Sequence, residues 1–257
     1  MPDLKTQSVP SVERALRILE VLANSKRGLS LAQLIQSIGI PKSSAHCLLL
    51  TLERNGFLRR NEASGRYLFG LKLFSLATMA VERIELREQV LPLLVGLMKK
   101  TGLTVHMALL EHGDAVLIER VEAPGPFRLA TWVGKRMGMH CTSLGKAIMA
   151  YLKPADLTIL VKEHGLPRHN QNTIASMREL REELDEVRRH GYAVDDQEEE
   201  MGLRCVGAPI FDRDGVPIAA ISLSGTTAQI CPADLTRLGE EVTKIAQDVS
   251  WKLGFAG

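Results

Sequence analysis

Apolar residues recur at helical spacing near the start of the chain, between residues 11 and 28. Ser11 is a residue type that caps helix amino termini, and Lys26-Arg27-Gly28 is typical of a helix end. The spacing predicts a first helix, whose buried face would consist of Val12, Ala15, Leu16, Leu19, Leu22 and Ala23.

Two further short helices follow. Ser30 and Gln33 have the spacing of a capping box, which predicts a second helix that ends at Gly39. Pro41 suits the first turn of a third helix, which Asn55-Gly56 would end. Because a tight turn joins these two helices, they form a candidate helix-turn-helix.

A hairpin is expected directly after the third helix. The strand-like runs FLRR (residues 57–60) and RYLF (66–69) flank a polar turn that contains Gly65. A hairpin in this position is the wing of a winged helix-turn-helix.

The outward side of the third helix is polar, since Ala45, Leu48, Leu49 and Leu52 share its inner face. A helix amino terminus with lysine and serine can contact phosphates and base edges in a major groove. Arginines on the hairpin can bind the DNA backbone or reach the minor groove. The alternative is that all of these residues are ordinary solvated surface. The candidate DNA-binding residues are Lys42, Ser43, Ser44, His46, Cys47, Leu50 and Arg54 of the helix, and Arg59, Arg60 and Arg66 of the hairpin.

The charge is distributed unevenly along the chain. The net charge of the 257 residues is only +2, but residues 1–70 hold ten Lys and Arg against five Asp and Glu. A basic first part on a mildly acidic remainder indicates a polyanionic partner for the first part alone.

The connector at residues 70–86 has two apolar stripes at helical spacing. A helix that is apolar on two sides must bury both, one of them against a second subunit, or else it is a core helix within one chain. A dimer would hold two recognition helices at a fixed separation and read a palindromic site. The stripes are Leu73, Leu76, Ala77, Ala80 and Ile84, and Leu71, Phe74, Thr78 and Val81.

The remainder of the chain alternates between strand-like and helical patterns, after a helical stretch at 87–101 that contains Pro92. Strands are expected at 104–110, 115–121, 127–133, 192–195, 204–211 and 217–224, and helices at 143–152, 156–164, 176–190 and 232–253. Most neighbouring strands are joined by turns or by outlying helices, which predicts an antiparallel sheet covered by helices and an α+β fold class.

Three segments of this part could converge on a ligand. The start of the helix at 143 offers hydroxyl groups and amide groups to a carboxylate, and Asp195 could accept hydrogen bonds from a ligand hydroxyl. Ser222 and Ser224 lie two apart, so they face the same side of their strand. The candidate effector-binding residues are Thr142, Ser143, Leu144, Gly145, Asp195, Leu203, Cys205, Ser222 and Ser224.

Each of these assignments has a structural alternative. The two serines could be hydrogen-bonded within the fold, and residues 198–200 have the pattern of a solvated acidic loop. Lys146 could be an exposed helix residue or an anion ligand. Because neighbours alternate sides on a strand, Asp196 is expected to face solvent when Asp195 does not.

Several functions are not supported by any motif. The four cysteines lie far apart, which predicts neither a disulfide framework nor a metal site, and no cofactor is expected. No H-E-x-x-H, G-x-S-x-G or Walker motif occurs, and the adjacent His140 and Cys141 would diverge in an extended segment, so no catalytic residue is assigned. Without a long apolar run or a signal-peptide pattern, the sequence predicts a cytoplasmic protein and no membrane partner.

The chain resembles the isocitrate-lyase-regulator (IclR) family of bacterial transcription factors. The resemblance rests on residues 11–22, 29–58 and 67–77, and on GMHCTSLGKAIMAYL (138–152), HGYAVDDQEEEMGLRCVGAPIFD (190–212) and PIAAISLSG (217–225). It implies that Ser143, Leu144, Asp195, Leu203, Cys205, Ser222 and Ser224 line an effector pocket. Cys47 stands where family members commonly have arginine, and Leu50 where they are often polar, which bears on the operator that is read.

The resemblance implies a winged helix-turn-helix at 1–70, a linker helix at 71–86 and a GAF/PAS-like effector-binding domain at 87–257. It implies a homodimer or a dimer of dimers on double-stranded DNA, most often a repressor of a catabolic operon controlled by a small carboxylic acid. A transcriptional activator, or a metabolic enzyme with a DNA-binding front domain, is the alternative.

Overall fold

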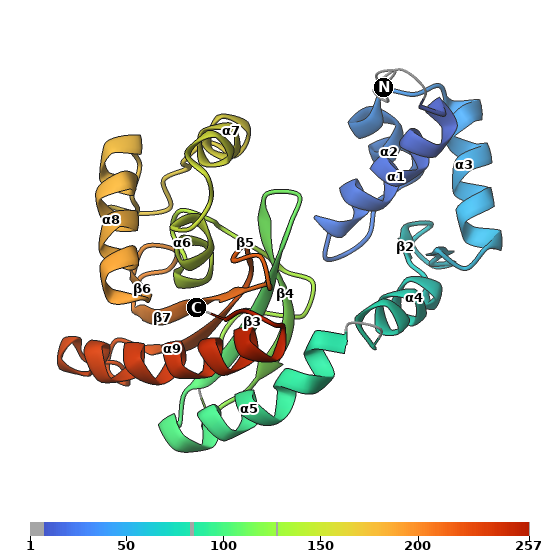
Figure 1. The fold of residues 1–257 in the computed structure, drawn as a ribbon. Helices are drawn as coiled ribbons and strands as arrows, with labels where there is room; N and C mark the ends of the chain where they lie inside the picture. Colours follow the sequence, from blue (N-terminus) through green and yellow to red (C-terminus); the bar gives the residue numbers. More distant parts are fainter. Residues whose placement is uncertain (1–7, 83–84, 127, 257) are drawn as a thin grey trace. The chain divides into compact units, whose positions relative to one another are not determined.

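The chain divides into two compact units, residues 1–84 and 85–257 (Figure 1). The structure is a computed structural model that describes residues 8–82, 85–126 and 128–256, without the side chains of residues 78, 80–82, 85 and 86.

The first unit is a winged helix-turn-helix. The capping box is confirmed, since the Ser30 side chain accepts the Gln33 amide and the Gln33 side chain accepts the Ser30 amide. Gly39 ends the second helix at φ 71°, a left-handed conformation that glycine adopts without strain. The elements are α1 (Pro10–Ala23), α2 (Leu31–Ile38), α3 (Lys42–Arg54), and the antiparallel strands β1 (Leu58–Arg60) and β2 (Tyr67–Phe69).

The first helix differs from its prediction at both ends. Its N-cap is Val9 and its first residue is Pro10, so Ser11 is not the cap. Proline suits this position because its fixed φ matches the helix and its missing amide hydrogen is not needed there. The helix ends at Ala23, before the predicted stop at Lys26.

The buried face of α1 was also predicted wrongly in part. Val12, Leu16 and Ala23 are exposed, whereas Ile18 and Leu22 are buried. The core is built from one face of each helix and from the hairpin. Its buried members are Ile18, Leu22, Leu34, Ile38, Ile40, Ala45, Leu49, Leu58 and Tyr67.

The connector forms α4 (Leu71–Glu82), which exposes large apolar side chains. Leu71 is 82% exposed and Phe74 is 72% exposed, and Leu76 and Met79 are exposed as well. The described residues therefore leave Leu71, Phe74 and Leu76 exposed. The predicted stripe members Thr78, Ala80, Val81 and Ile84 lie outside the described side chains.

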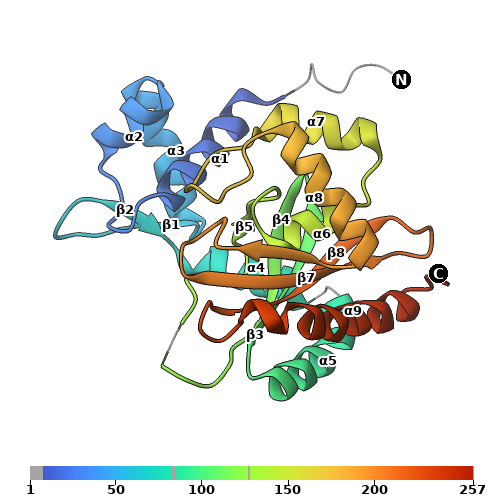
Figure 2. The same cartoon turned by 90° about the vertical axis from the view of Figure 1, so that its left-hand side faces the viewer.

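The second unit is a six-stranded antiparallel sheet in the order β5-β4-β3-β8-β7-β6, with helices on both faces. α5 and α9 pack together on one face, and α6, α7 and α8 lie on the other (Figures 1 and 2). The strands are β3 (Thr104–Glu111), β4 (Asp114–Val121), β5 (Arg136–Met137), β6 (Ala193–Asp196), β7 (Leu203–Phe211) and β8 (Pro217–Thr226). The helices are α5 (Glu85–Thr101), α6 (Ser143–Met149), α7 (Pro154–His164), α8 (Met177–His190), η2 (Pro232–Asp234) and α9 (Leu235–Lys252).

The predicted α+β class is confirmed, and five of the six predicted strands are present. The strand predicted at 127–133 is wrong: residues 128–133 are irregular, Phe127 lies outside the described residues, and β5 follows instead. The apolar alternation there has another cause, because Leu129 is buried against a cavity rather than against a neighbouring strand. None of the described helices is long and apolar enough to cross a membrane.

Two glycines of the first unit differ in what an added Cβ would contact, so substituting both separates the cost of a steric clash from the cost of backbone strain. Gly28 (φ 69°) and Gly39 (φ 71°) both have left-handed backbones, but a Cβ on Gly28 would lie 2.4 Å from the Tyr67 carbonyl oxygen, and a Cβ on Gly39 meets nothing within 4 Å. We expect Gly39→Ala to cost about 1–2 kcal/mol of the free energy of unfolding, and Gly28→Ala to cost more. Amide hydrogen exchange of α1–α3 in the full chain measures both losses. Equal losses would show that the contact at Gly28 relaxes.

Candidate functional site

The outward face of α3 holds the predicted reading residues. Ala45 and Leu49 are buried and fix the rotation of the helix about its axis. Its N-cap is Pro41, whose side chain has no hydrogen-bond acceptor, so the first amides of α3 are available to a phosphate. Of the predicted residues, Ser44 is half-buried, and the others on this helix are exposed: Lys42, Ser43, His46, Cys47, Leu50 and Arg54.

The three arginines of the wing are in different situations. Arg59 and Arg60 are exposed, and the Arg60 guanidinium lies 5.9 Å from the centre of the Tyr67 ring. Arg66 is half-buried, and its Nη1 donates to the Gly28 carbonyl at 2.8 Å and to Gln33 Oε1 at 3.3 Å. Arg66 therefore ties the wing to the start of α2, which sequence analysis did not foresee.

One further cation lies beside α3. Arg14 of α1 is exposed and lines a shallow cleft with Ser43 and Cys47. Arg14 lies outside the third helix and the hairpin, so it was not among the predicted DNA-binding residues.

In the second unit, the three predicted segments converge on one cavity. Eight of the nine predicted effector-binding residues line it: Thr142, Ser143, Leu144, Asp195, Leu203, Cys205, Ser222 and Ser224. The cavity encloses about 50 Å³. That volume holds a few water molecules, whereas a small-molecule pocket has roughly 300 Å³ or more.

Gly145, the ninth predicted residue, does not line the cavity. Its amide donates to Thr142 Oγ1 at 3.0 Å, which caps α6, and a Cβ there would lie 2.2 Å from the Met139 carbonyl oxygen. Gly145 therefore allows the start of α6 to pack closely against the preceding turn.

His106 is a cavity residue that sequence analysis missed. It is 3% exposed, with Nδ1 3.2 Å from Ser224 Oγ and Nε2 2.9 Å from Thr131 Oγ1. Burial, with the nearby charges of Arg120 and Lys135, lowers the pKa of His106 to about 3, so the ring is neutral at physiological pH. A lone histidine in an apolar strand gave no signal of this role. Other lining residues that were missed are Leu129, Ala130, Thr131, Lys135, Met137, Glu199 and Glu200.

Lys135 places a cation beside this cavity. It is half-buried, its Nζ donates to the Ala130 carbonyl at 3.3 Å, and it lies 5.5 Å from the centre of the Trp132 ring. The carboxyl groups in the lining come from Asp195, Glu199 and Glu200.

The alternation predicted for the two aspartates of β6 is confirmed. Asp195 is 3% exposed, whereas the Asp196 side chain is 51% exposed and pairs with Arg204. Burial raises the pKa of Asp195 to about 6, against the opposing effect of the Glu198 amide, which donates to Asp195 Oδ1 at 2.8 Å. One oxygen of Asp195 thus shapes the turn after β6.

Lys146 fits neither of its two predicted roles. It is completely buried in α6, and its Nζ lies 2.8 Å from Glu183 Oε1 of α8 and 2.5 Å from Glu198 Oε1. Burial alone would lower the pKa of Lys146, but the two carboxylates outweigh burial and raise it. The expectation of a solvated loop at 198–200 is therefore wrong for Glu198, which is buried.

Cys141 does not have the surroundings of a catalytic nucleophile. It is buried, and its thiol donates to Glu199 Oε2 at 2.9 Å. Burial and the nearby carboxylates raise the pKa of this thiol, whereas nucleophilic cysteines have a lowered pKa. The alternative of an enzyme gains no support from this cysteine.

Comparisons with known proteins agree across both units. The family model "IclR helix-turn-helix domain" matches residues 11–62, and "Bacterial transcriptional regulator IclR C-terminal" matches residues 78–251. The chain is 35% identical over 251 residues to the transcriptional repressor IclR of Escherichia coli K12, which covers 97% of this chain and 92% of that protein.

Solved structures show the same fold. The crystal structure of an IclR transcriptional regulator from Alicyclobacillus acidocaldarius has a TM-score of 0.84 and 28% identity, covering 96% of this chain and 100% of that one. An IclR homologue from Microbacterium hydrocarbonoxydans, complexed with 4-hydroxybenzoate, has a TM-score of 0.78 over 95% of this chain and 98% of that one. At 24% identity the second likeness concerns the fold.

The ion pairs of Lys146 allow a stability test. We expect Lys146→Met to lower the free energy of unfolding by about 3–5 kcal/mol, because Glu198 loses its buried partner. The double variant Lys146→Met/Glu198→Gln removes the stranded charge, so it should recover part of that loss. Urea unfolding of both variants measures the difference. A double variant no more stable than the single one would show that the lysine stem, and not the charge, carries the effect.

Proposed function

Because the chain belongs to the IclR family of bacterial transcriptional regulators, we propose that it is a repressor whose affinity for an operator is controlled by a small organic acid. The observation that carries the proposal is the pairing of an outward-facing basic reading helix in one unit with a polar cavity in the other. The helix would bind duplex DNA, and the cavity would bind the metabolite.

The DNA-reading residues are those that α3 and the wing leave in solvent. Lys42 and the first amides of α3 would contact phosphates, and Arg59 and Arg60 would contact the backbone on the wing side. The exposed side chains of Cys47 and Leu50 would make apolar contacts with thymine methyl groups in the major groove.

A second copy of the chain would cover the apolar side chains of α4. Leu71 and Phe74 are mostly exposed in a single chain, which is costly for side chains of this size. A symmetric dimer through this helix would present two copies of α3 to the two halves of a palindromic operator.

The effector class follows from the polar groups of the cavity. Lys135 offers a cation and Thr142 and Ser143 offer hydroxyl groups to a carboxylate, while Asp195 and Ser224 suit hydroxyl groups of a ligand. A small hydroxylated carboxylic acid satisfies both sets. The Microbacterium homologue of the same fold holds 4-hydroxybenzoate, so the fold can take an acid of this size.

Binding of such an acid must enlarge the cavity, which is now about 50 Å³. Leu129, Ala130, Thr131 and Lys135 line the cavity, and the contact of Thr131 with His106 would have to open. An acid that prefers the opened form shifts the population towards it, and DNA that prefers the closed form shifts it back. The two affinities are then coupled by the same factor in both directions.

The DNA-binding part of the proposal is tested with duplexes selected by the protein from a random library. We expect Arg59→Ala to weaken binding and to reduce the slope of log Kobs against log salt by about one, since the variant neutralises one phosphate fewer. Arg178→Ala, an exposed arginine of α8, is the matched control and should change neither quantity. Arg66→Ala should instead destabilise the first unit, since its guanidinium is bonded within the fold. An unchanged salt slope in Arg59→Ala would remove that residue from the interface.

The effector part is tested by binding of the same duplex in the presence of a panel of small carboxylic acids. We expect Asp195→Asn and Ser224→Ala to keep DNA affinity and to become at least ten-fold less sensitive to the active acid, because each removes a polar group or a charge from the cavity. Asp156→Asn, on the exposed side of α7, is the matched control. Normal responses in both cavity variants would move the effector site elsewhere. Transcription that the bound protein raises, and does not lower, would identify an activator.

A further inference from the structure

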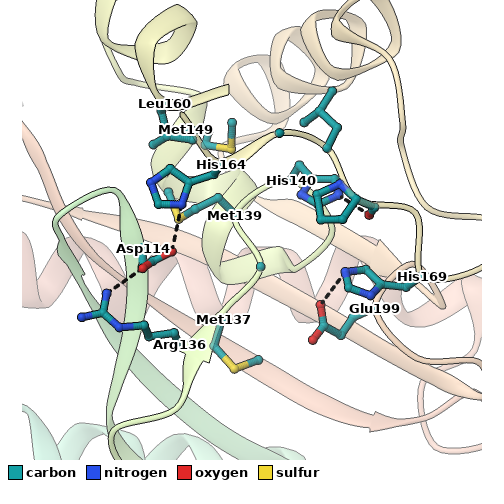
Figure 3. Close-up of a pocket in the computed structure, with 14 residues that line it drawn as sticks. Asp114, Arg136, Met137, Met139, His140, Met149, Leu160, His164, His169 and Glu199 are labelled. Carbon is teal, nitrogen blue, oxygen red and sulfur yellow. Dashed lines mark hydrogen bonds and ion pairs between the residues drawn. The ribbon is translucent and has the colours of Figure 1, made fainter. Parts of the chain in front are cut away.

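A second pocket lies beside the effector cavity and has no part in the proposed function. It has a volume of about 290 Å³. It is lined by the start of β4, by β5 and the segment that follows it, by the end of α7 and the loop after it, and by the turn after β6 (Figure 3). Glu199 and Met137 line both this pocket and the effector cavity. Its lining includes His140, His169 and Glu199, and the buried Cys141 lies directly beside them.

Three of these side chains already converge. The ligand atoms of His140, Cys141 and His169 all lie within 4.8 Å of one another. Cys141 Sγ is 2.9 Å from Glu199 Oε2, and His169 Nε2 is 4.0 Å from the same oxygen. Figure 3 shows His169 and Glu199 facing each other across this wall.

His140 is oriented as metal-binding histidines usually are. Its Nε2 lies 3.0 Å from the Pro167 carbonyl oxygen, so Nε2–H donates and the lone pair is left on Nδ1. A ligating histidine commonly donates its other N–H to a backbone carbonyl in this way.

The hydrogen-bond partner of Cys141 is a carboxylate. Its thiol is buried and donates to Glu199 Oε2 at 2.9 Å. Lys146, the buried cation nearby in the chain, is already paired with Glu183 and Glu198. A divalent metal would stabilise the thiolate, and the thiol proton would be released to solvent.

We propose that His140, Cys141, His169 and Glu199 form a binding site for a divalent transition metal of the zinc class. Imidazole and thiolate ligands favour zinc over magnesium and calcium, which take oxygen ligands. Four protein ligands close a tetrahedral shell, which is typical of a structural site rather than a catalytic one. Sequence spacing predicted no metal site because His169 and Glu199 reach Cys141 only through the fold.

The site would act on the effector cavity through Glu199. This carboxylate lines the cavity next to residues of α6 and the turn after β6, so a metal that takes it as a ligand would fix that wall. All four ligands lie in the second unit, so metal binding does not depend on DNA binding.

Titration of the metal-free full chain with Co²⁺ tests the proposal, because a cobalt–thiolate bond gives a charge-transfer band in the near ultraviolet. We expect one Co²⁺ per chain with this band, displacement by Zn²⁺ and no displacement by excess Mg²⁺. Cys141→Ser should lose the band. His169→Ala should weaken Co²⁺ binding at least ten-fold, and it should fold normally because the His169 side chain is 40% exposed.

Two variants are matched controls. His164→Ala removes a histidine of the same pocket that faces Asp114 instead (Figure 3). Cys231→Ser removes an exposed cysteine. Both should bind Co²⁺ as the unaltered chain does. Absence of the band in the unaltered chain, its persistence in Cys141→Ser, or equal losses in His164→Ala and His169→Ala would overturn the proposal.

Discussion

The position of α6 against the sheet is the constraint on which the second unit depends. A Cβ on Gly145 would lie 2.2 Å from the Met139 carbonyl oxygen, and a Cβ on Gly207 of β7 would lie 2.9 Å from the Ser143 carbonyl oxygen. Only glycine permits an approach this close at both points. The buried Lys146 then ties α6 to α8 and to the turn after β6 through its ion pairs with Glu183 and Glu198. These contacts together set where Ser143 and its neighbours stand in the effector cavity.

Much of the fold could be predicted because it depends on short-range chemistry. The Ser30 capping box, the left-handed end of α2 at Gly39 and the opposite faces of Asp195 and Asp196 each follow from residues close in sequence. The prediction of a strand at 127–133 failed for a physical reason. Leu129 is buried because it faces a cavity, and burial on one side of an irregular segment gives the same alternation as a strand.

What could not be predicted depends on residues that the fold brings together from distant parts of the chain. From the sequence, a lysine on a helix such as Lys146 is expected to be exposed. In the structure, Glu183 and Glu198, which lie in two other segments, form ion pairs with it. Similarly, Arg59 and Arg66 look alike on the hairpin, and only the position of the Gly28 carbonyl separates an arginine free to bind DNA from one that holds the wing. The candidates came from residue type, and tertiary contacts divide them into those left open to a ligand and those that support the fold.

The two pockets of the second unit share Glu199, and this has a consequence for electrostatics. Without a bound metal, the described lining of the proposed effector cavity has three carboxyl groups, those of Asp195, Glu199 and Glu200, and one amino group, that of Lys135, a balance that opposes an acidic ligand. A divalent cation bound by Glu199 would neutralise one of these carboxylates and add positive charge nearby, which raises the affinity for an acid. Because coupling between two ligands is reciprocal, the acid would raise the affinity for the metal by the same factor. By themselves, the carboxylates around the cavity disfavour binding of an organic acid. A metal bound at the neighbouring site would make these carboxylates compatible with binding of the acid.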